Sequence, residues 1–118
     1  MNNNEETNYK IGGQIWVQKD GDNFMGPGRI AMLENLAEGY TLEEVAKKMN
    51  MKLETAKNNI DAINKTAQKP LTKTRDKNHY EVTRYGIDII SKYKELKKEH
   101  DKILEELNKK FYKDILEG

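Results

Sequence analysis

Polar side chains that share one face of a short helical pattern are the residues in this sequence best suited to a binding chemistry. Over residues 53–64 the apolar residues follow a helical spacing, which predicts one buried stripe: Leu53, Ala56, Ile60 and Ile63. The opposite side would carry Glu54, Thr55, Asn58, Asp61 and Lys65, with Lys52, Lys57 and Asn59 beside it. Amide and hydroxyl groups hydrogen-bond to base edges, and ammonium groups attract phosphates. We therefore expect Thr55, Asn58 and Asn59 to contact bases, Glu54 to lie among them, and Lys52, Lys57 and Lys65 to contact the DNA backbone.

The same helix has a plainer interpretation. Amphipathic helix pairs joined by short turns are common in helical proteins that bind no nucleic acid, and a solvent-exposed face is polar in any case. Such a face is more often rich in Glu and Lys than in Asn, which favours the DNA interpretation. Glu54 and Asp61 are acidic, however, so a protein–protein adaptor remains the second hypothesis.

Two shorter helices are expected to position this third helix. Gly26-Pro27-Gly28 suits a helix start, because proline is tolerated in the first turn, and Ile30, Leu33, Leu36 and Ala37 then recur on one face. Thr41 and Glu44 have the spacing of a capping box, with Val45, Ala46 and Met49 as the buried stripe that follows. Asn50 enters the left-handed conformation at low cost and would end this second helix. Helix, tight turn and polar helix together predict a helix-turn-helix.

A basic β-hairpin is predicted directly after the third helix. Residues 71–74 and 80–83 have β-forming composition, and residues 75–79 would form the tip. Residues 65–84 hold six basic and two acidic residues, a net charge of +4 in a chain whose total is +1. A hairpin in this position is typical of the wing of a winged helix, so Lys73, Arg75 and Lys77 are expected to bind phosphates.

The N-terminal region predicts a polar tail followed by another small hairpin. Residues 1–8 are polar and are expected to be disordered. Residues 9–17 alternate like a strand, Gly12-Gly13 suggests a bulge or a close backbone approach, and Asp20-Gly21 suits a tight turn before a short strand at Phe24-Met25. Trp16 and Phe24 are expected to be core or interface aromatics.

One long helix is predicted from Arg84 onward, about 50 Å long at the standard rise. Its apolar residues follow the alternating spacing of a coiled-coil seam and then a broader face: Ile89, Tyr93, Leu96, His100, Ile103, Leu107 and Phe111. A helix of this length must bury its stripe against its own domain or against a second copy. Because the preceding residues already account for a small core, we predict a homodimer.

Several classes of function have no residues to support them. The chain has no cysteine, and no cluster of His, Asp and Glu has metal-ligand spacing. We find no catalytic triad, glycine-rich phosphate loop or isolated carboxylate pair, so we expect no enzyme and no cofactor. Neither a signal peptide nor an apolar run long enough to cross a bilayer is present, and we expect a cytoplasmic protein without membrane contact.

The order of these motifs resembles the DNA-binding half of the ModE family, the molybdate-responsive bacterial regulators. The resemblance rests on GPGRI at residues 26–30, the K-x-M-x-M turn at 47–51, the Pro-Leu pair that opens the wing and T-x-Y-G at 83–86. It implies a winged helix-turn-helix that dimerises, through the long helix among other elements, and binds near-palindromic operator DNA. The oxyanion-binding domains of the family have no counterpart in this sequence, so no molybdate binding is expected.

Five positions depart from the family pattern. Asn50 stands where the family usually has glycine, and Leu53, Glu54, Thr55 and Lys57 occupy positions where it tends to place tyrosine, basic groups and tryptophan. Base specificity is therefore not implied by the resemblance. We predict a mainly α protein with small β hairpins: a tail at residues 1–8, a winged helix-turn-helix domain at 9–83, and a dimerisation helix at 84–118. Its expected function is that of a homodimeric regulator that binds double-stranded DNA.

Overall fold

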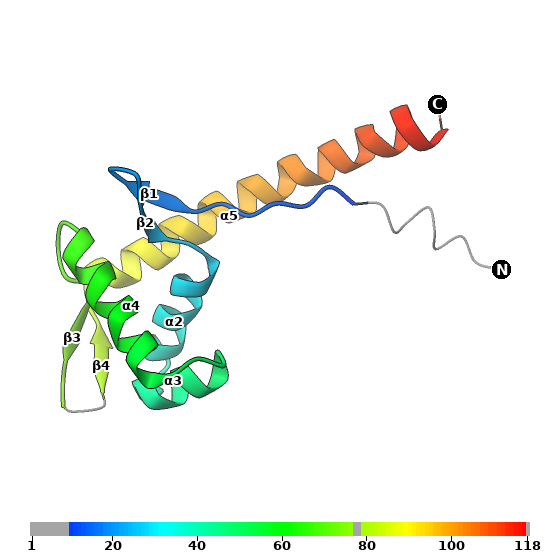
Figure 1. Ribbon diagram of the computed structural model, residues 1–118. Coiled ribbons are helices and arrows are strands. Elements are labelled where there is room, and N and C mark those ends of the chain that lie inside the picture. The colour runs from blue at the N-terminus through cyan, green and yellow to red at the C-terminus, as the bar shows by residue number, and fades with distance from the viewer. Residues whose placement is uncertain (1–9, 77–78, 118) are drawn as a thin grey trace.

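The computed structural model describes residues 10–76 and 79–117 and is mainly helical, with two small antiparallel hairpins. The elements are β1 (Val17–Lys19), β2 (Asp22–Met25), α2 (Pro27–Ala37), α3 (Leu42–Lys48), α4 (Leu53–Thr66), β3 (Thr72–Thr74), β4 (Tyr80–Val82), α5 (Arg84–Phe111) and the short π-helix η1 (Tyr112–Glu117). Helices α2, α3 and α4 pack together, the β3–β4 hairpin lies beside them, and α5 extends away from them (Figure 1). The longest dimension is 59 Å, and α5 accounts for most of it.

The core lies between α2, α3 and α4 and is closed by the start of α5. Its buried apolar residues are Met25, Ile30, Met32, Leu33, Leu36, Leu42, Val45, Ala46, Ala56, Ile60, Ile63, Leu71, Ile90 and Tyr93. The apolar stripes predicted for the three helices are confirmed, except at Ala37. That residue is exposed because it is the last residue of α2, where the chain leaves the core.

Local sequence signals define α3 and its connection to α4. The Thr41 hydroxyl accepts a hydrogen bond from the Glu44 amide at 3.1 Å, and the Glu44 carboxylate accepts one from the Thr41 amide at 2.9 Å. The Thr41 hydroxyl also donates to the Glu44 carboxylate at 3.1 Å. The bond from the Thr41 amide, as the largest cause, and the bond from the hydroxyl, as the second, hold the pKa of Glu44 below its usual value. Asn50 has φ of +56°, so the predicted left-handed residue ends this helix. The predicted capping box and turn are both confirmed.

The N-terminal hairpin is shorter than predicted. Asp20 and Gly21 both have positive φ and form the predicted tight turn, but strand pairing begins only at Val17, and the irregularity in register lies at Val17/Gln18 rather than at Gly12-Gly13. The strand predicted for residues 9–17 is therefore wrong over 10–16, and Tyr9 lies outside the described residues. The partner strand β2 has four residues and cannot pair with so long a segment.

Residues 10–16, which we call the N-terminal strap, run along α5 instead (Figure 1). The Tyr93 hydroxyl donates to the Ile15 carbonyl at 2.7 Å. The Asn108 side chain accepts from the Ile11 amide at 2.6 Å and donates to the Ile11 carbonyl at 3.0 Å. Side chains of a helix thus satisfy backbone groups that a second strand would otherwise pair.

Helix α5 has two different environments along its length. Thr83 caps it by accepting from the Gly86 amide at 3.0 Å, and its first turns pack on α2 through Ile90 and Tyr93. Tyr93 is only 4% exposed, so its predicted place in a dimer interface is wrong: it belongs to the core of its own protomer. The second half projects beyond the three-helix core and is accompanied by the strap (Figure 1).

Candidate nucleic-acid interface

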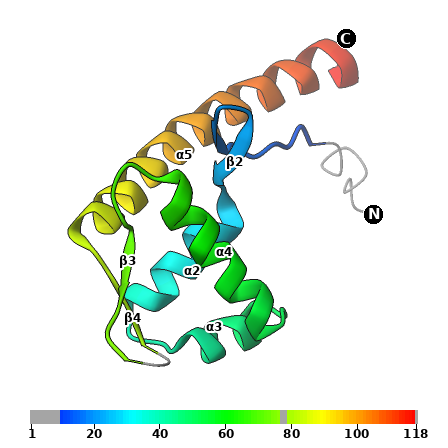
Figure 2. The same ribbon diagram turned by 60° about the vertical axis from the view of Figure 1, so that its left-hand side comes forward.

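The outward face of α4 is the surface that the sequence predicts to contact DNA. Its apolar stripe packs inward, and the predicted residues on the opposite side are exposed: Lys52, Glu54, Thr55, Lys57, Asn58, Asp61 and Lys65. Figure 2 shows α4 in front of α2, with the β3–β4 hairpin on one side. The structure therefore places a two-sided helix at the surface, with its amide, hydroxyl and ammonium groups turned to solvent.

Asn59 differs from its neighbours on α4. It is half-buried, its side-chain oxygen accepts from Nε of Arg29 at 3.0 Å, and its side-chain nitrogen donates to the Thr55 carbonyl at 3.0 Å. The prediction that Asn59 reads bases is thus not supported by its geometry, because its amide is engaged within the protein. Thr55 and Asn58 remain the candidate base-reading residues.

The β3–β4 hairpin is held firmly against α4 by one side chain. The Asn64 side-chain oxygen accepts from the Leu71 amide at 2.8 Å, and its nitrogen donates to the Thr72 hydroxyl at 2.9 Å. Leu71 is fully buried, and Thr72 is the buried polar residue at the base of β3. This joint was missed from the sequence, since Asn64 lies on the flank of α4 and belongs to neither the apolar stripe nor the outer face.

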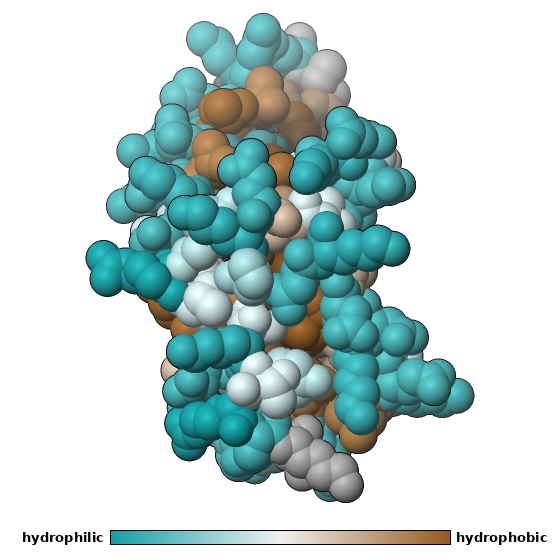
Figure 3. Space-filling view, turned by 90° about the vertical axis from the view of Figure 1, so that its left-hand side faces the viewer, coloured by the Kyte–Doolittle hydropathy of each residue, from teal (hydrophilic) through white to brown (hydrophobic). Residues whose placement is uncertain are grey.

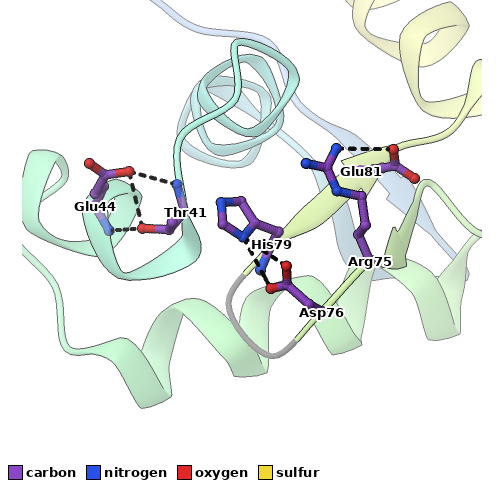
Figure 4. A network of polar contacts seen from close by, with 6 residues as sticks. All are labelled: Thr41, Glu44, Arg75, Asp76, His79 and Glu81. Atoms are coloured by element: carbon purple, nitrogen blue, oxygen red, sulfur yellow. Dashed lines mark hydrogen bonds and ion pairs between the residues drawn. The ribbon is translucent and has the colours of Figure 1, made fainter.

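Lys73 and Arg75, two of the three basic residues predicted on the hairpin, are exposed but are not isolated. The register pairs Lys73 with Glu81, and the Glu81 carboxylate lies 3.9 Å from Nζ of Lys73. The same carboxylate lies 3.5 Å from the Arg75 guanidinium (Figure 4). Exposed ion pairs at these distances contribute little stability, so Lys73 and Arg75 can leave Glu81 and bind another anion. Lys77 lies outside the described residues.

Asp76 and His79 contact each other across the end of the hairpin. The Asp76 carboxylate accepts from the His79 amide at 3.1 Å and lies 3.0 Å from Nδ1 of the same residue. Figure 4 shows His79 on the side of the hairpin that faces Thr41 and Glu44 at the start of α3. The face seen in Figure 3, the left-hand side of Figure 1, is mainly hydrophilic, with apolar groups visible between the polar side chains.

The predicted seam on α5 is divided by the strap. Ile89 and Phe111 are half-buried, and His100 is half-buried beside Gly13 of the strap. Leu96, Ile103 and Leu107 are 49%, 57% and 43% exposed and form one apolar stripe, which we call the α5 stripe. The seam residues that remain exposed are therefore Leu96, Ile103 and Leu107, on the face of the helix next to the one that the strap covers.

The comparisons with known proteins gave no similar sequence. No protein-family model matches the chain, and a search of curated proteins found no relative. Within residues 10–76 and 79–117, no three His, Asp or Glu side chains are grouped as a metal site would require. None of the helices in that part of the chain has the length and apolarity needed to cross a membrane.

Proposed function

We propose that this protein is a DNA-binding transcriptional regulator of the winged helix-turn-helix kind, as its ModE-like motifs predict, and that it binds operator DNA as a homodimer. The observation that carries the proposal is the exposed polar face of α4, fixed by Asn64 beside a hairpin that presents Lys73 and Arg75. A helix of 14 residues is about 21 Å long and fits the major groove, while a basic hairpin beside it reaches the flanking phosphates.

The homodimer part of the proposal rests on the α5 stripe. Leu96, Ile103 and Leu107 are large, exposed and separated by seven and four residues, so they follow one side of the helix. Contiguous exposed apolar surface of this kind marks an interaction site. A twofold dimer through two copies of α5 would present two α4 helices to two half-sites of a palindromic operator.

The competing function is that of a protein–protein adaptor with the same architecture. Glu54 and Asp61 on the outer face of α4, and Glu81 between the hairpin cations, reduce the positive potential that a DNA-binding surface needs. An adaptor would use the same polar face to bind a partner protein. The two functions differ in the response of binding to phosphate, to salt and to single charges.

Removing the hairpin cations tests the proposal. Changing Lys73 and Arg75 together to Ala should weaken binding to selected and scrambled duplexes alike, and should reduce the salt slope by about one unit per lost contact. Glu81→Gln should have the opposite sign and strengthen binding to both duplexes, because it leaves both cations without their internal partner. A damaged fold would not bind more tightly, so Glu81→Gln separates electrostatics from misfolding.

Asn58→Ala in the same experiment tests base reading. A side chain that pairs with a base edge contributes about 1–3 kcal/mol of discrimination, so its loss should relax the preference at one base pair in each half-site. The measurement is affinity for selected and scrambled duplexes by fluorescence anisotropy. Equal losses on both duplexes would remove Asn58 from the base-reading residues, and no effect of Glu81→Gln or the double Ala variant would favour the adaptor.

A further inference from the structure

A hollow of about 420 Å³ lies beside Arg29, between the start of α2, the N-terminal hairpin and α4, and it is lined by neither the candidate base-reading residues Thr55 and Asn58 nor the β3–β4 hairpin. We call it the Arg29 hollow; Trp16, Pro27, Gly28, Met32 and Asn59 line it with Arg29. We infer that the Arg29 hollow seats a phosphate group of the DNA backbone. This inference rests on the proposed function and adds to it a contact on the flank of α4 that lies away from the wing.

The guanidinium of Arg29 is held in place by neutral groups. Its Nε donates to the Asn59 side chain at 3.0 Å, and one terminal nitrogen donates to the carbonyls of Asn23 and Phe24 at 2.9 and 3.1 Å. All three acceptors are amide oxygens. Among the described residues no carboxylate forms an ion pair with Arg29, and its second terminal nitrogen, Nη2, has no hydrogen-bond partner.

A fixed cation of this kind favours an anion as its remaining partner. Arg29 is half-buried, and its burial lowers the pKa of the guanidinium because solvation of the charge is lost without a neighbouring negative charge. A guanidinium binds phosphate oxygens with directed, charge-assisted hydrogen bonds. Since its other donors already hold it in one orientation, little side-chain entropy would be lost when the phosphate binds.

The position of the hollow relative to α4 identifies the source of the phosphate. Asn59 contacts Arg29 and Asn64 contacts the β3–β4 hairpin, and five residues along a helix correspond to a rotation of about 140°. The two contacts thus lie on opposite flanks of α4, one on each side of the outward face that carries Asn58 and Lys65. A duplex placed on that face would have one strand near Lys73 and Arg75 and the other near Arg29, the arrangement that a helix in the major groove requires.

A double-mutant cycle between Arg29 and single DNA phosphates tests the inference. Single phosphates of the duplex selected by the wild-type protein would be replaced by neutral methylphosphonates, and affinity measured for wild type and Arg29→Gln. At one phosphate in each half-site, the methylphosphonate should lower the affinity of the wild type about tenfold, as expected for loss of a charge-assisted bond. The same methylphosphonate should not change the affinity of the Arg29→Gln variant. Asn59→Ala, which keeps the charge and removes its support, should show an intermediate loss at the same phosphate.

A merely structural role for Arg29 gives a different pattern. In that case Arg29→Gln would weaken binding to every duplex while leaving the methylphosphonate pattern of the wild type unchanged, and the inference would be overturned. Circular dichroism of both variants establishes whether they fold, and the phosphate scan of the wild type alone locates the contact relative to the wing.

Titration with inorganic phosphate, without DNA, separates this inference from the proposed function. A saturable shift of the Arg29 Nε–H resonance by phosphate, and not by chloride at equal ionic strength, would establish the anion seat even if no duplex binds. If phosphate binds and the cycle shows no coupling, the DNA source is overturned and the seat belongs to a small phosphate-bearing ligand. If the wild type binds DNA but shows neither coupling nor a phosphate shift, the inference fails while the proposed function stands.

Discussion

Replacing Leu96 and Ile103 together by glutamate should convert the proposed dimer into a folded monomer. Both side chains are about half exposed in the protomer, so the change leaves the core of α2, α3 and α4 intact. In the dimer each glutamate would lie buried without a partner, which is costly. Because a duplex with two half-sites is bound with avidity only by a dimer, its affinity should fall by at least about a hundredfold.

Sedimentation equilibrium at micromolar concentration measures the change in mass, and anisotropy measures the loss of affinity. Ser91→Glu combined with Lys98→Glu is a matched control, since these residues are also exposed, also seven apart, and lie on the opposite side of α5. The control variant should remain a dimer. A wild-type monomer, or a dimer that survives glutamate at both Leu96 and Ile103, would contradict the proposed interface.

Gly86→Ala should lower the free energy of unfolding by about 2–3 kcal/mol, because an added methyl group has no space. A Cβ at Gly86 would collide with the Leu71 carbonyl and would lie 2.6 Å from Cγ1 of Val82. Leu71 is fully buried and its carbonyl also accepts from the Thr83 amide at 2.8 Å, so neither neighbour moves without disturbing the junction of hairpin and α5.

Urea unfolding followed by circular dichroism measures this loss of stability. Gly28→Ala is the matched control, because Gly28 also lies in the first turn of a helix and has open space around the added Cβ. This control should be neutral or should stabilise the protein by up to about 1 kcal/mol. Equal stabilities of the two variants would show that the packing at Gly86 is not as close as described.

The elements that depend on local chemistry were predictable from the sequence. The Thr41–Glu44 capping box, the left-handed Asn50 and the Asp20-Gly21 turn each involve residues no more than three apart, and all three are present. The outward face of α4 also followed from periodicity, since three of its four predicted inward residues are fully buried and the fourth is half-buried.

The parts that were missed depend on contacts between distant residues. Arg29 and Asn59 are 30 residues apart, and Ile11 and Asn108 are 97 apart, so no spacing rule connects them. The strap residues have β-forming composition, yet the amide and carbonyl of Ile11 and the carbonyl of Ile15 bond to side chains of α5 rather than to a strand. The seam on α5 was likewise predicted as one dimer interface. In the structure Tyr93 is buried in the core of the chain, and His100 is half-buried beside Gly13 of the strap.

The charge of the β3–β4 hairpin was only partly predictable from the sequence. A net charge of +4 over residues 65–84 predicts a positive hairpin, but the count does not show that Glu81 lies opposite Lys73 and next to Arg75. The antiparallel register contains that information, because strands that end at residues 74 and 80 necessarily pair residue 73 with residue 81. The predicted strand boundaries therefore place the Glu81 carboxylate opposite Lys73, where it reduces the positive charge of the hairpin.

The most direct test of DNA binding is the affinity of the wild-type protein for a duplex of about 30 base pairs, measured by anisotropy from about 50 to 300 mM salt. The logarithm of the binding constant should fall linearly with the logarithm of salt concentration, with a slope steeper than about −3, since each neutralised phosphate contributes about −0.9. The candidate contacts on α4 and the hairpin are Lys52, Lys57, Lys65, Lys73 and Arg75, and Arg29 is the further contact inferred above. No binding at about 50 mM salt, where the phosphate term is strong, would contradict the regulator and favour the adaptor.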